Sequence, residues 1–172
     1  LGFQIVPLRN GSYLGRIGRR YRKRGRSSQL SIAGRSPRRL KTAYEELSEE
    51  IPGLGLLAVT SPDRLHSDWL DAKRRRREER GAAPAGIEKI LKWLAPDAGL
   101  ITVIDGHPAT LSWLGAVSGH RVYPLGVETF GQSGDINDLY EHYGLDTEAI
   151  LEAAARSSLR RISSSNKVFR TA

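Results

Sequence analysis

The 172-residue sequence lacks cysteine and methionine, has no acidic residue in its first 44 positions and contains no long apolar run. Without cysteine there are no disulfides and no thiolate metal sites. No apolar run approaches the ~20 residues that are needed to cross a bilayer. The short apolar stretch at the N-terminus lacks both a preceding basic region and a small-residue cleavage site, so no signal peptide is predicted. Together these absences favour a cytoplasmic protein.

The missing methionine also bears on how the chain begins. Leu1 is bulky, whereas removal of an initiator methionine usually requires a small second residue. We therefore expect either a fragment of a longer protein or a non-standard start codon written as leucine. The length is enough for one domain with a single core, and the 39% of apolar residues is compatible with a globular fold.

The net charge of +8 belongs to a short arm. Residues 1–44 hold twelve lysines and arginines and no acidic residue, and the remaining 15 of the 27 basic residues share the rest of the chain with all 19 acidic ones. We expect residues 1–39 to form a basic arm that is disordered or aberrant, with a short strand at residues 3–6. Such an arm would bind nucleic acid with steep salt dependence, unless its charge is an accident of composition.

Strand-like and helix-like segments alternate after this arm. Apolar runs predict strands at residues 28–34, 54–60, 100–105 and 120–127. Helical spacing and capping residues predict helices at 37–51, from 61 onward, and at 86–94, 109–117, 136–144 and 146–156. The alternation predicts an α/β fold with a largely parallel sheet.

Asp105, Gly106 and His107 follow the predicted strand at 100–105, where open α/β sheets place their ligands. One interpretation is an acid–base pair, in which the aspartate orients an imidazole that moves protons near neutral pH. The other is a strand-to-helix turn, in which Gly106 supplies backbone freedom and Pro108 starts the helix. The turn is favoured, because the sequence fixes no serine or cysteine nucleophile beside the pair.

A second candidate is the glycine-rich turn that contains Phe130, Gly131 and Ser133. Such turns can cradle phosphate on free backbone amides. Here Asp135 would cap those amides itself and repel an anion, and no Lys-Ser/Thr pair follows the second glycine. Phosphate binding is therefore not favoured. The four histidines lack metal-ligand spacing, so no metal site is predicted.

Several long stretches resemble the C-terminal domain of the transketolase-like thiamine diphosphate enzymes. They are "GLGLLAVTSPDRLHSDW" and "AGLITVIDGHPATLSWLGAVSGHRVYPLGVETFGQSGDINDLYEHYGLDTEAI". Within the second, "VETFGQSGDINDLYEHYGLD" is similar to the family's end-of-domain signature of a Phe-Gly-x-Ser turn, a short helix and a Gly-x-Asp leading into the last helix. The resemblance runs from Leu40 to Ala155 and is strongest to the homodimeric first, decarboxylating component of the pyruvate dehydrogenase complex.

This resemblance implies a three-layer α/β/α sandwich with a mostly parallel, mixed sheet of about five strands. It implies a domain over residues 40–156 that helps to form a dimer. The segment that follows, 157–172, is rich in serine and arginine and is expected to be a frayed tail. Asp105, Gly106, His107, Phe130, Gly131 and Ser133 become turn or interface residues under this interpretation.

The resemblance places thiamine diphosphate and magnesium between two upstream domains, so it implies no catalytic, cofactor-binding or metal-binding residue in this chain. The parent enzyme would decarboxylate pyruvate oxidatively and pass the acyl group to a lipoyl carrier. The implied partners are the upstream thiamine-binding domains, a second subunit and the lipoyl acyltransferase of the complex.

The basic arm departs from the family, which has a Gly-Ala-Val-x-Pro-Glu-Ala segment before its first helix. This chain has "AGRSPRR" at residues 33–39. Written as GC-rich codons and read from the third base, that string becomes Gly-Ala-Val-Ala-Pro-Glu, so a frameshift near Arg39 is one hypothesis. Two further alternatives remain: a binding module whose arm engages nucleic acid or an acidic partner, and a hydrolase that uses Asp105 and His107.

Overall fold

The computed structural model describes most of the chain after the arm and parts of the arm itself. The described backbone comprises residues 2–7, 13–18, 28–34, 37–51, 54–79, 81–92, 94–129 and 131–168. Side chains are described between residues 40 and 159 within these ranges.

Six strands form one mixed sheet in the order β1-β2-β4-β3-β5-β6. They are β1 (Gly2–Pro7), β2 (Tyr13–Gly18), β3 (Ser28–Gly34), β4 (Gly55–Val59), β5 (Leu94–Val103) and β6 (Arg121–Leu125). Strand β3 pairs in parallel with β4 and β5, and β5 pairs in parallel with β6, whereas β1, β2 and β4 pair antiparallel. The predicted α/β class with a parallel sheet is confirmed. The expected number of about five strands is not, because an N-terminal hairpin extends the sheet.

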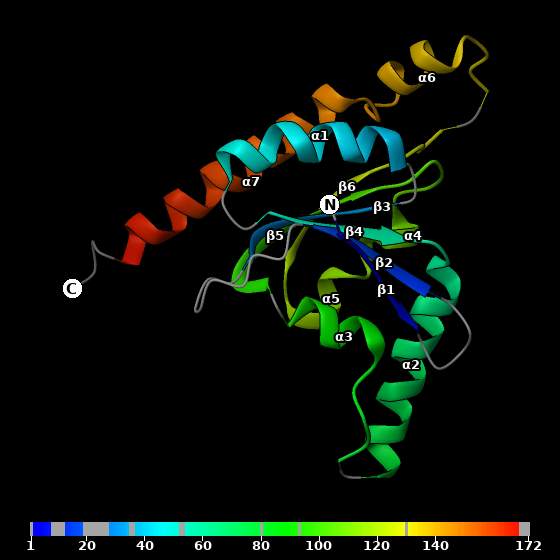
Figure 1. Ribbon diagram of the computed structural model, residues 1–172, viewed down its shortest axis with the longest axis vertical. Coiled ribbons are helices and arrows are strands. Elements are labelled where there is room, and N and C mark those ends of the chain that lie inside the picture. Colours follow the sequence, from blue (N-terminus) through cyan, green and yellow to red (C-terminus); the bar gives the residue numbers. More distant parts are fainter. Residues whose placement is uncertain are drawn as a thin grey trace.

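Helices lie on both faces of this sheet (Figure 1). They are α1 (Pro37–Glu50), α2 (Pro62–Glu78), α3 (Gly86–Leu91), α4 (Ala109–Ser112), α5 (Gly115–Ser118), α6 (Ile136–His142) and α7 (Thr147–Val168). Helices α1 and α7 cover one face, while α2, α3 and α5 lie on the other (Figure 1). None of the helices described is long and apolar enough to span a bilayer.

Several predicted elements differ from the structure. The single helix expected at 109–117 is the two short helices α4 and α5, and α7 continues to Val168 through most of the segment predicted as a frayed tail. Strand β5 begins at Leu94, six residues before the strand predicted at 100–105, where the helix predicted at 86–94 was expected to end. Strands β1, β2 and β3 lie within the range predicted as an arm, although strands at 3–6 and 28–34 were expected and are confirmed as β1 and β3. Residues 19–27 lie outside the described residues, and the domain boundary at residue 39 stays a prediction.

Strand β5, which lies inside the sheet between β3 and β6, explains why the chain folds around two cores. Its residues from Ala98 to Val103 are all buried, as expected for a strand that is covered on both faces. Alternate side chains of a strand point to opposite faces, so Leu100 joins one cluster while Ile101 and Val103 join the other. The apolar run without alternation therefore marks the middle of the sandwich.

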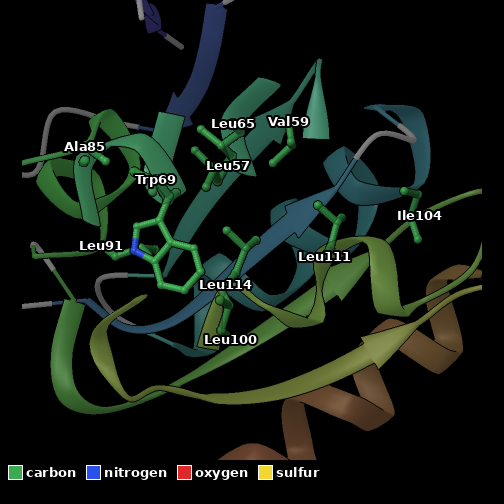
Figure 2. Close-up of a cluster of buried hydrophobic side chains, with 12 residues drawn as sticks. Leu57, Val59, Leu65, Trp69, Ala85, Leu91, Leu100, Ile104, Leu111 and Leu114 are labelled. Atoms are coloured by element: carbon green, nitrogen blue, oxygen red, sulfur yellow. The ribbon is translucent and has the colours of Figure 1, made fainter. Parts of the chain in front are cut away.

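The first cluster lies between the sheet and helices α2 to α5 (Figure 2). Trp69 contributes the largest side chain, beside Leu91 and Leu114 (Figure 2). The second cluster lies under α1 and α7 and contains Leu40, Leu47, Leu56, Ile101, Val103, Leu145 and Ile150 among its members. Burial of both apolar sets stabilises the sheet from its two sides.

A partly buried ion pair links helix α2 to helix α3. Arg76 Nη1 and Nη2 donate to Glu88 Oε2 and Oε1 at 2.8 and 2.6 Å, and the Ala85 backbone N–H donates to Oε2 at 2.7 Å. The Glu88 side chain is only 18% exposed. The hydrogen bonds from Arg76, the largest cause, hold the pKa of Glu88 below its usual value. A two-pronged contact of this kind fixes both orientation and spacing of the two helices.

Thr102 places an unpartnered hydroxyl in the centre of the sheet. Its side chain is fully buried, and its Oγ1 has no hydrogen-bond partner in the described part of the protein. Replacing the hydroxyl by a methyl group in Thr102→Val is expected to raise the free energy of unfolding by about 1 kcal/mol, because it removes an unsatisfied buried polar atom. Thr102→Ser keeps the hydroxyl and loses the methyl, so it is expected to destabilise. Urea unfolding of both variants measures the effect, and a destabilised Thr102→Val would contradict it.

Candidate functional site

The turn after β5 holds Asp105 and His107 apart. The hydroxyl of Tyr140 donates to Asp105 Oδ2 at 3.0 Å, which ties the turn to α6. The backbone N–H of Ala109 donates to His107 Nδ1 at 3.2 Å, so the imidazole caps the start of α4. Both side chains are exposed, and in the described structure neither bonds to the other. The geometry therefore does not bring them together as an acid–base pair.

Close packing in this turn depends on Gly126 and not on Gly106. Gly106 has no positive φ, and a Cβ added there would have only the Ile104 side chain within 4 Å, at 3.9 Å. A Cβ at Gly126 would lie 2.6 Å from the Gly106 carbonyl oxygen and 2.8 Å from the Pro108 nitrogen. The Val127 N–H also donates to the Gly106 carbonyl at 2.8 Å, which draws the two loops together. The interpretation that Gly106 supplies backbone freedom is thus wrong.

The second predicted turn is an exposed connection between β6 and α6. Phe130 lies outside the described residues, and Gly131 and Ser133 are exposed. Gly131 has φ of +113°, which favours glycine. Asp135 Oδ1 accepts a hydrogen bond from the Asn137 N–H at 3.0 Å. The carboxylate therefore occupies the position that a phosphate would need, as the sequence predicted.

A groove of about 580 Å³ opens between the end of β6, the end of α6 and one side of α7. Its lining residues are Tyr123, Pro124, Leu125, Gly126, Glu128, Thr129, His142, Tyr143, Gly144, Ala149, Glu152, Ala153 and Arg156. The α7 members recur at helical spacing, so one face of the helix forms a wall. Position at the carboxyl end of a parallel strand is typical of ligand clefts in α/β folds. This groove is taken as the candidate site among the described residues.

The groove combines small apolar residues with a charged rim. Ala149 and Ala153 leave space against β6, while Glu152 and Arg156 pair across 2.6 Å on exposed side chains. His142 packs edge-on against Tyr143, with ring centroids 4.9 Å apart. Among the described lining residues, no nucleophile is oriented by a base.

Strand β6 is one of the two outer strands of the sheet, and its free edge is poorly suited to pairing with a further strand. The Ile104 N–H donates to the Leu125 carbonyl, so the backbone groups of Leu125 face β5. Alternation then turns the backbone groups of Pro124 outward. Proline has no N–H, and its place on an outer edge discourages pairing with another strand. A partner in the groove would therefore contact side chains instead of extending the sheet.

The residues described do not fit a thiamine diphosphate–magnesium site. Magnesium is held by oxygen ligands gathered from several residues, yet no group of three or more acidic or histidine side chains in the described structure is placed to hold a metal. The four histidines lie apart: His66 stacks with Trp113 at a centroid distance of 4.6 Å, and His120 is buried at the start of β6.

Sequence reasoning missed the groove and the Arg76–Glu88 pair. The groove joins β6 to residues of α7 that follow some thirty positions later, and the ion pair joins residues twelve apart. No local pattern marks either contact. The helical recurrence of Ala149, Glu152, Ala153 and Arg156 was the one available signal for the groove wall, although it does not identify what the wall faces.

Comparisons with known proteins show the fold. No protein-family model matches the sequence, and no curated protein matches it. A split gene transketolase, solved as an inactive β4 tetramer, matches with a TM-score of 0.51 and 13% identity over 77% of this chain and 40% of its own. Transketolase from Leishmania mexicana matches with a TM-score of 0.50 and 18% identity over 77% of this chain and 17% of its own. The chain therefore has a transketolase-like fold and spans less than half the length of either protein.

Proposed function

We propose that this chain is the C-terminal, structural domain of a thiamine diphosphate-dependent 2-oxoacid dehydrogenase subunit, similar to the first component of pyruvate dehydrogenase. The parent enzyme decarboxylates pyruvate oxidatively and transfers the acyl group to a lipoyl carrier. The chain alone does not catalyse. Its partners are the upstream thiamine-binding domains, a second subunit and the lipoyl acyltransferase.

The observation that carries the proposal is the likeness to transketolase chains over 77% of this chain, which amounts to only 40% and 17% of their lengths. A domain that corresponds to part of a larger enzyme is expected to work within an assembly. One of the two similar proteins is a split gene transketolase, so a protein of this fold encoded in pieces has a precedent.

The finer assignment rests on the end-of-domain signature. Asp135 caps α6, and Gly144 ends that helix region with φ of +61°. Asp146 Oδ1 then accepts a hydrogen bond from the Ala149 N–H at 3.0 Å at the start of α7. Each residue of the matched stretch "VETFGQSGDINDLYEHYGLD" named here thus has a structural reason for its type. This supports a resemblance to the family in local structure as well as in amino-acid sequence.

Within the parent enzyme, this chain would position neighbouring domains and would contribute no reacting group. The sandwich presents the groove and helix α6 on one edge, and both are available to neighbouring domains. Asp105, through its hydrogen bond to Tyr140, holds α6 in register with the turn after β5. A rigid edge of this kind positions partner domains without contributing a reacting group.

The proposal is tested by restoring activity. The purified chain is mixed with a protein that comprises the two thiamine-binding domains of a pyruvate dehydrogenase first component, with thiamine diphosphate and magnesium present. We expect pyruvate decarboxylation in the mixture and none from the chain alone. The matched control uses Gly106→Ala, which is expected to restore activity as well as the parent chain does because its added Cβ has no close neighbour. Activity of the chain alone, or a mixture no more active than its parts, would contradict the proposal.

A further inference from the structure

The groove between β6 and α7 is lined by polar groups that the proposed function does not use. Glu128 and Glu152 contribute exposed carboxylates, and Tyr123 and Tyr143 contribute half-buried rings. Within the described structure, no hydrogen bond or ion pair engages the Glu128 carboxylate or either tyrosine hydroxyl. Unengaged polar groups in a concave site are the ones that orient a ligand.

The chemistry of these groups favours a positively charged ligand. An ionised carboxylate accepts hydrogen bonds and cannot donate them, so Glu128 and Glu152 require a donor. Tyrosine rings attract a cation that lies over their faces. Two basic side chains also line the groove, but Arg156 is already paired with Glu152 at 2.6 Å, and His142 packs edge-on against Tyr143. A guanidinium or ammonium group therefore fits the lining better than an anion does.

The surface around the groove carries the same sign of charge. Residues 122–155 contain seven acidic residues and no lysine or arginine, although the whole chain has a net charge of +8. Glu141 in the last turn of α6 and Glu148, one turn before Glu152 on α7, are exposed and enter no ion pair among the described side chains. A concave site surrounded by one sign of charge concentrates ligands of the opposite sign. Because the chain as a whole repels cations, binding of a cation would identify this local surface.

The dimensions of the groove indicate a short extended segment instead of a folded surface. Its volume of about 580 Å³ lies within the range of sites that enclose a drug-sized molecule, which corresponds to a few amino-acid residues. Ala149 and Ala153 on the α7 wall leave room for a long side chain between the helix and β6. Pro124 has no N–H to offer at the outer edge of β6, so a segment bound here is recognised through its side chains and not by strand pairing.

We propose that the groove binds a basic, extended segment of a partner protein and takes an arginine or lysine side chain of that segment into its lining. The carboxylates of Glu128 and Glu152 accept hydrogen bonds from the cationic group. The rings of Tyr123 and Tyr143 contact its aliphatic stem and its charge. The contact does not depend on the proposed function, because it uses only side chains of this chain's own groove.

Fluorescence anisotropy on the full chain tests the contact. The probe is a labelled six-residue peptide that alternates arginine with glycine, and the control peptide has glutamine in place of each arginine. At about 50 mM ionic strength, where exposed charges are weakly screened, the arginine peptide is expected to bind at least about tenfold more tightly than the glutamine peptide. The difference is expected to shrink as salt is added. Equal binding of the two peptides, or binding of neither, would overturn the proposal.

Two variants of equal charge change separate the groove from general electrostatics. Glu128→Gln with Glu152→Gln removes both carboxylates of the lining and is expected to raise the Kd of the arginine peptide about tenfold. Glu78→Gln with Glu79→Gln removes two exposed carboxylates at the end of α2 and is expected to change that Kd less than about twofold. Equal weakening by both variants would overturn the proposal. Circular dichroism checks that both remain folded.

A pair of variants without charge change tests the shape of the site. Ala149→Phe fills space on the α7 wall and is expected to weaken binding about fivefold, whereas Ala155→Phe on an exposed position of the same helix, outside the lining, is expected to leave it unchanged. Equal binding by the two variants would contradict the assignment to the groove. Light scattering examines a second copy as occupant: association of the free chain that Glu128→Gln with Glu152→Gln abolishes would assign the groove to that copy and overturn the proposal.

Discussion

Replacing Gly126 by alanine is expected to lower the free energy of unfolding by about 3 kcal/mol, the upper end of the range for overpacking. The added Cβ would lie within 2.6 Å of the Gly106 carbonyl oxygen and 2.9 Å of Pro108 Cδ. These neighbours are backbone and a proline ring, which cannot rotate away. The loop after β6 must therefore separate from the turn after β5. The expected fall in Tm is about 10 °C for a chain of this size.

The matched control is Gly106→Ala on the opposite side of the same contact. The nearest atom to its added Cβ is 3.9 Å away, and its φ is not in the left-handed region. This substitution is expected to be neutral or to stabilise by about 0.5 kcal/mol, because alanine restricts the unfolded chain. Thermal unfolding of the two variants side by side measures the contrast. A stable Gly126→Ala protein, or a disrupted Gly106→Ala protein, would show that the two loops are packed differently.

The substitution Glu88→Gln is expected to lower the free energy of unfolding by about 2 kcal/mol at neutral pH, as for hydrogen bonds to a charged group. Glu88 Oε2 accepts from both Arg76 and the Ala85 N–H, so an amide NH2 at that position would face two donors. The charge of Arg76 would also lose its partner. Urea unfolding followed by the fluorescence of the tryptophans, of which Trp69 lies in the adjoining core, measures the loss.

The same pair predicts how stability depends on pH. Because Arg76 lowers the pKa of Glu88 in the folded state, the contribution of this carboxylate is complete above its ordinary unfolded value of about 4.3. It is lost as the pH falls below that value and through the lower pKa of the folded state. The difference between the parent chain and Glu88→Gln is therefore expected to shrink as the pH falls from about 5 to about 3.

An exposed ion pair on the same helix provides the control. Arg74 pairs with Asp71 on side chains that are 71% and 40% exposed. Removing it with Asp71→Asn is expected to cost less than about 0.5 kcal/mol, because solvent screens such pairs. A loss as large as that of Glu88→Gln would indicate that general electrostatics, and not the α2–α3 contact, controls stability.

The parallel part of the sheet was largely predictable because its strands contain short apolar segments, of which β4 is apolar throughout. Strands β3, β4 and β6 fall on predicted runs, whereas β5 begins at Leu94, six residues before the predicted strand. The helix at 109–117 divides because Gly115 approaches the β6 region closely: an added Cβ would lie 2.7 Å from the His120 carbonyl. That constraint comes from tertiary packing, and the spacing of apolar residues in the sequence does not reveal it. Strand β2 was missed because its two glycines and its arginine leave a weak local strand signal.

Capping residues were predicted more reliably than the site. Asp135 and Asp146 cap the helices that their positions indicate, since a cap depends on residues two or three positions away. The groove depends on how α7 packs against β6, which the chain order does not specify. The sequence pointed to Gly106, whereas the tight contact requires glycine at Gly126. This could not be predicted either, because the contact forms between two loops that are distant in the sequence.

The central claim is that this chain is one domain of a larger thiamine diphosphate enzyme, and its most direct test is physical association. Size-exclusion chromatography with light scattering is applied to the chain, to the two upstream thiamine-binding domains and to their mixture, in the same buffer. The account predicts a stable complex that contains both components and that forms with the parent chain and with Gly106→Ala. A monodisperse 19.0 kDa monomer that elutes separately from the upstream domains would contradict it.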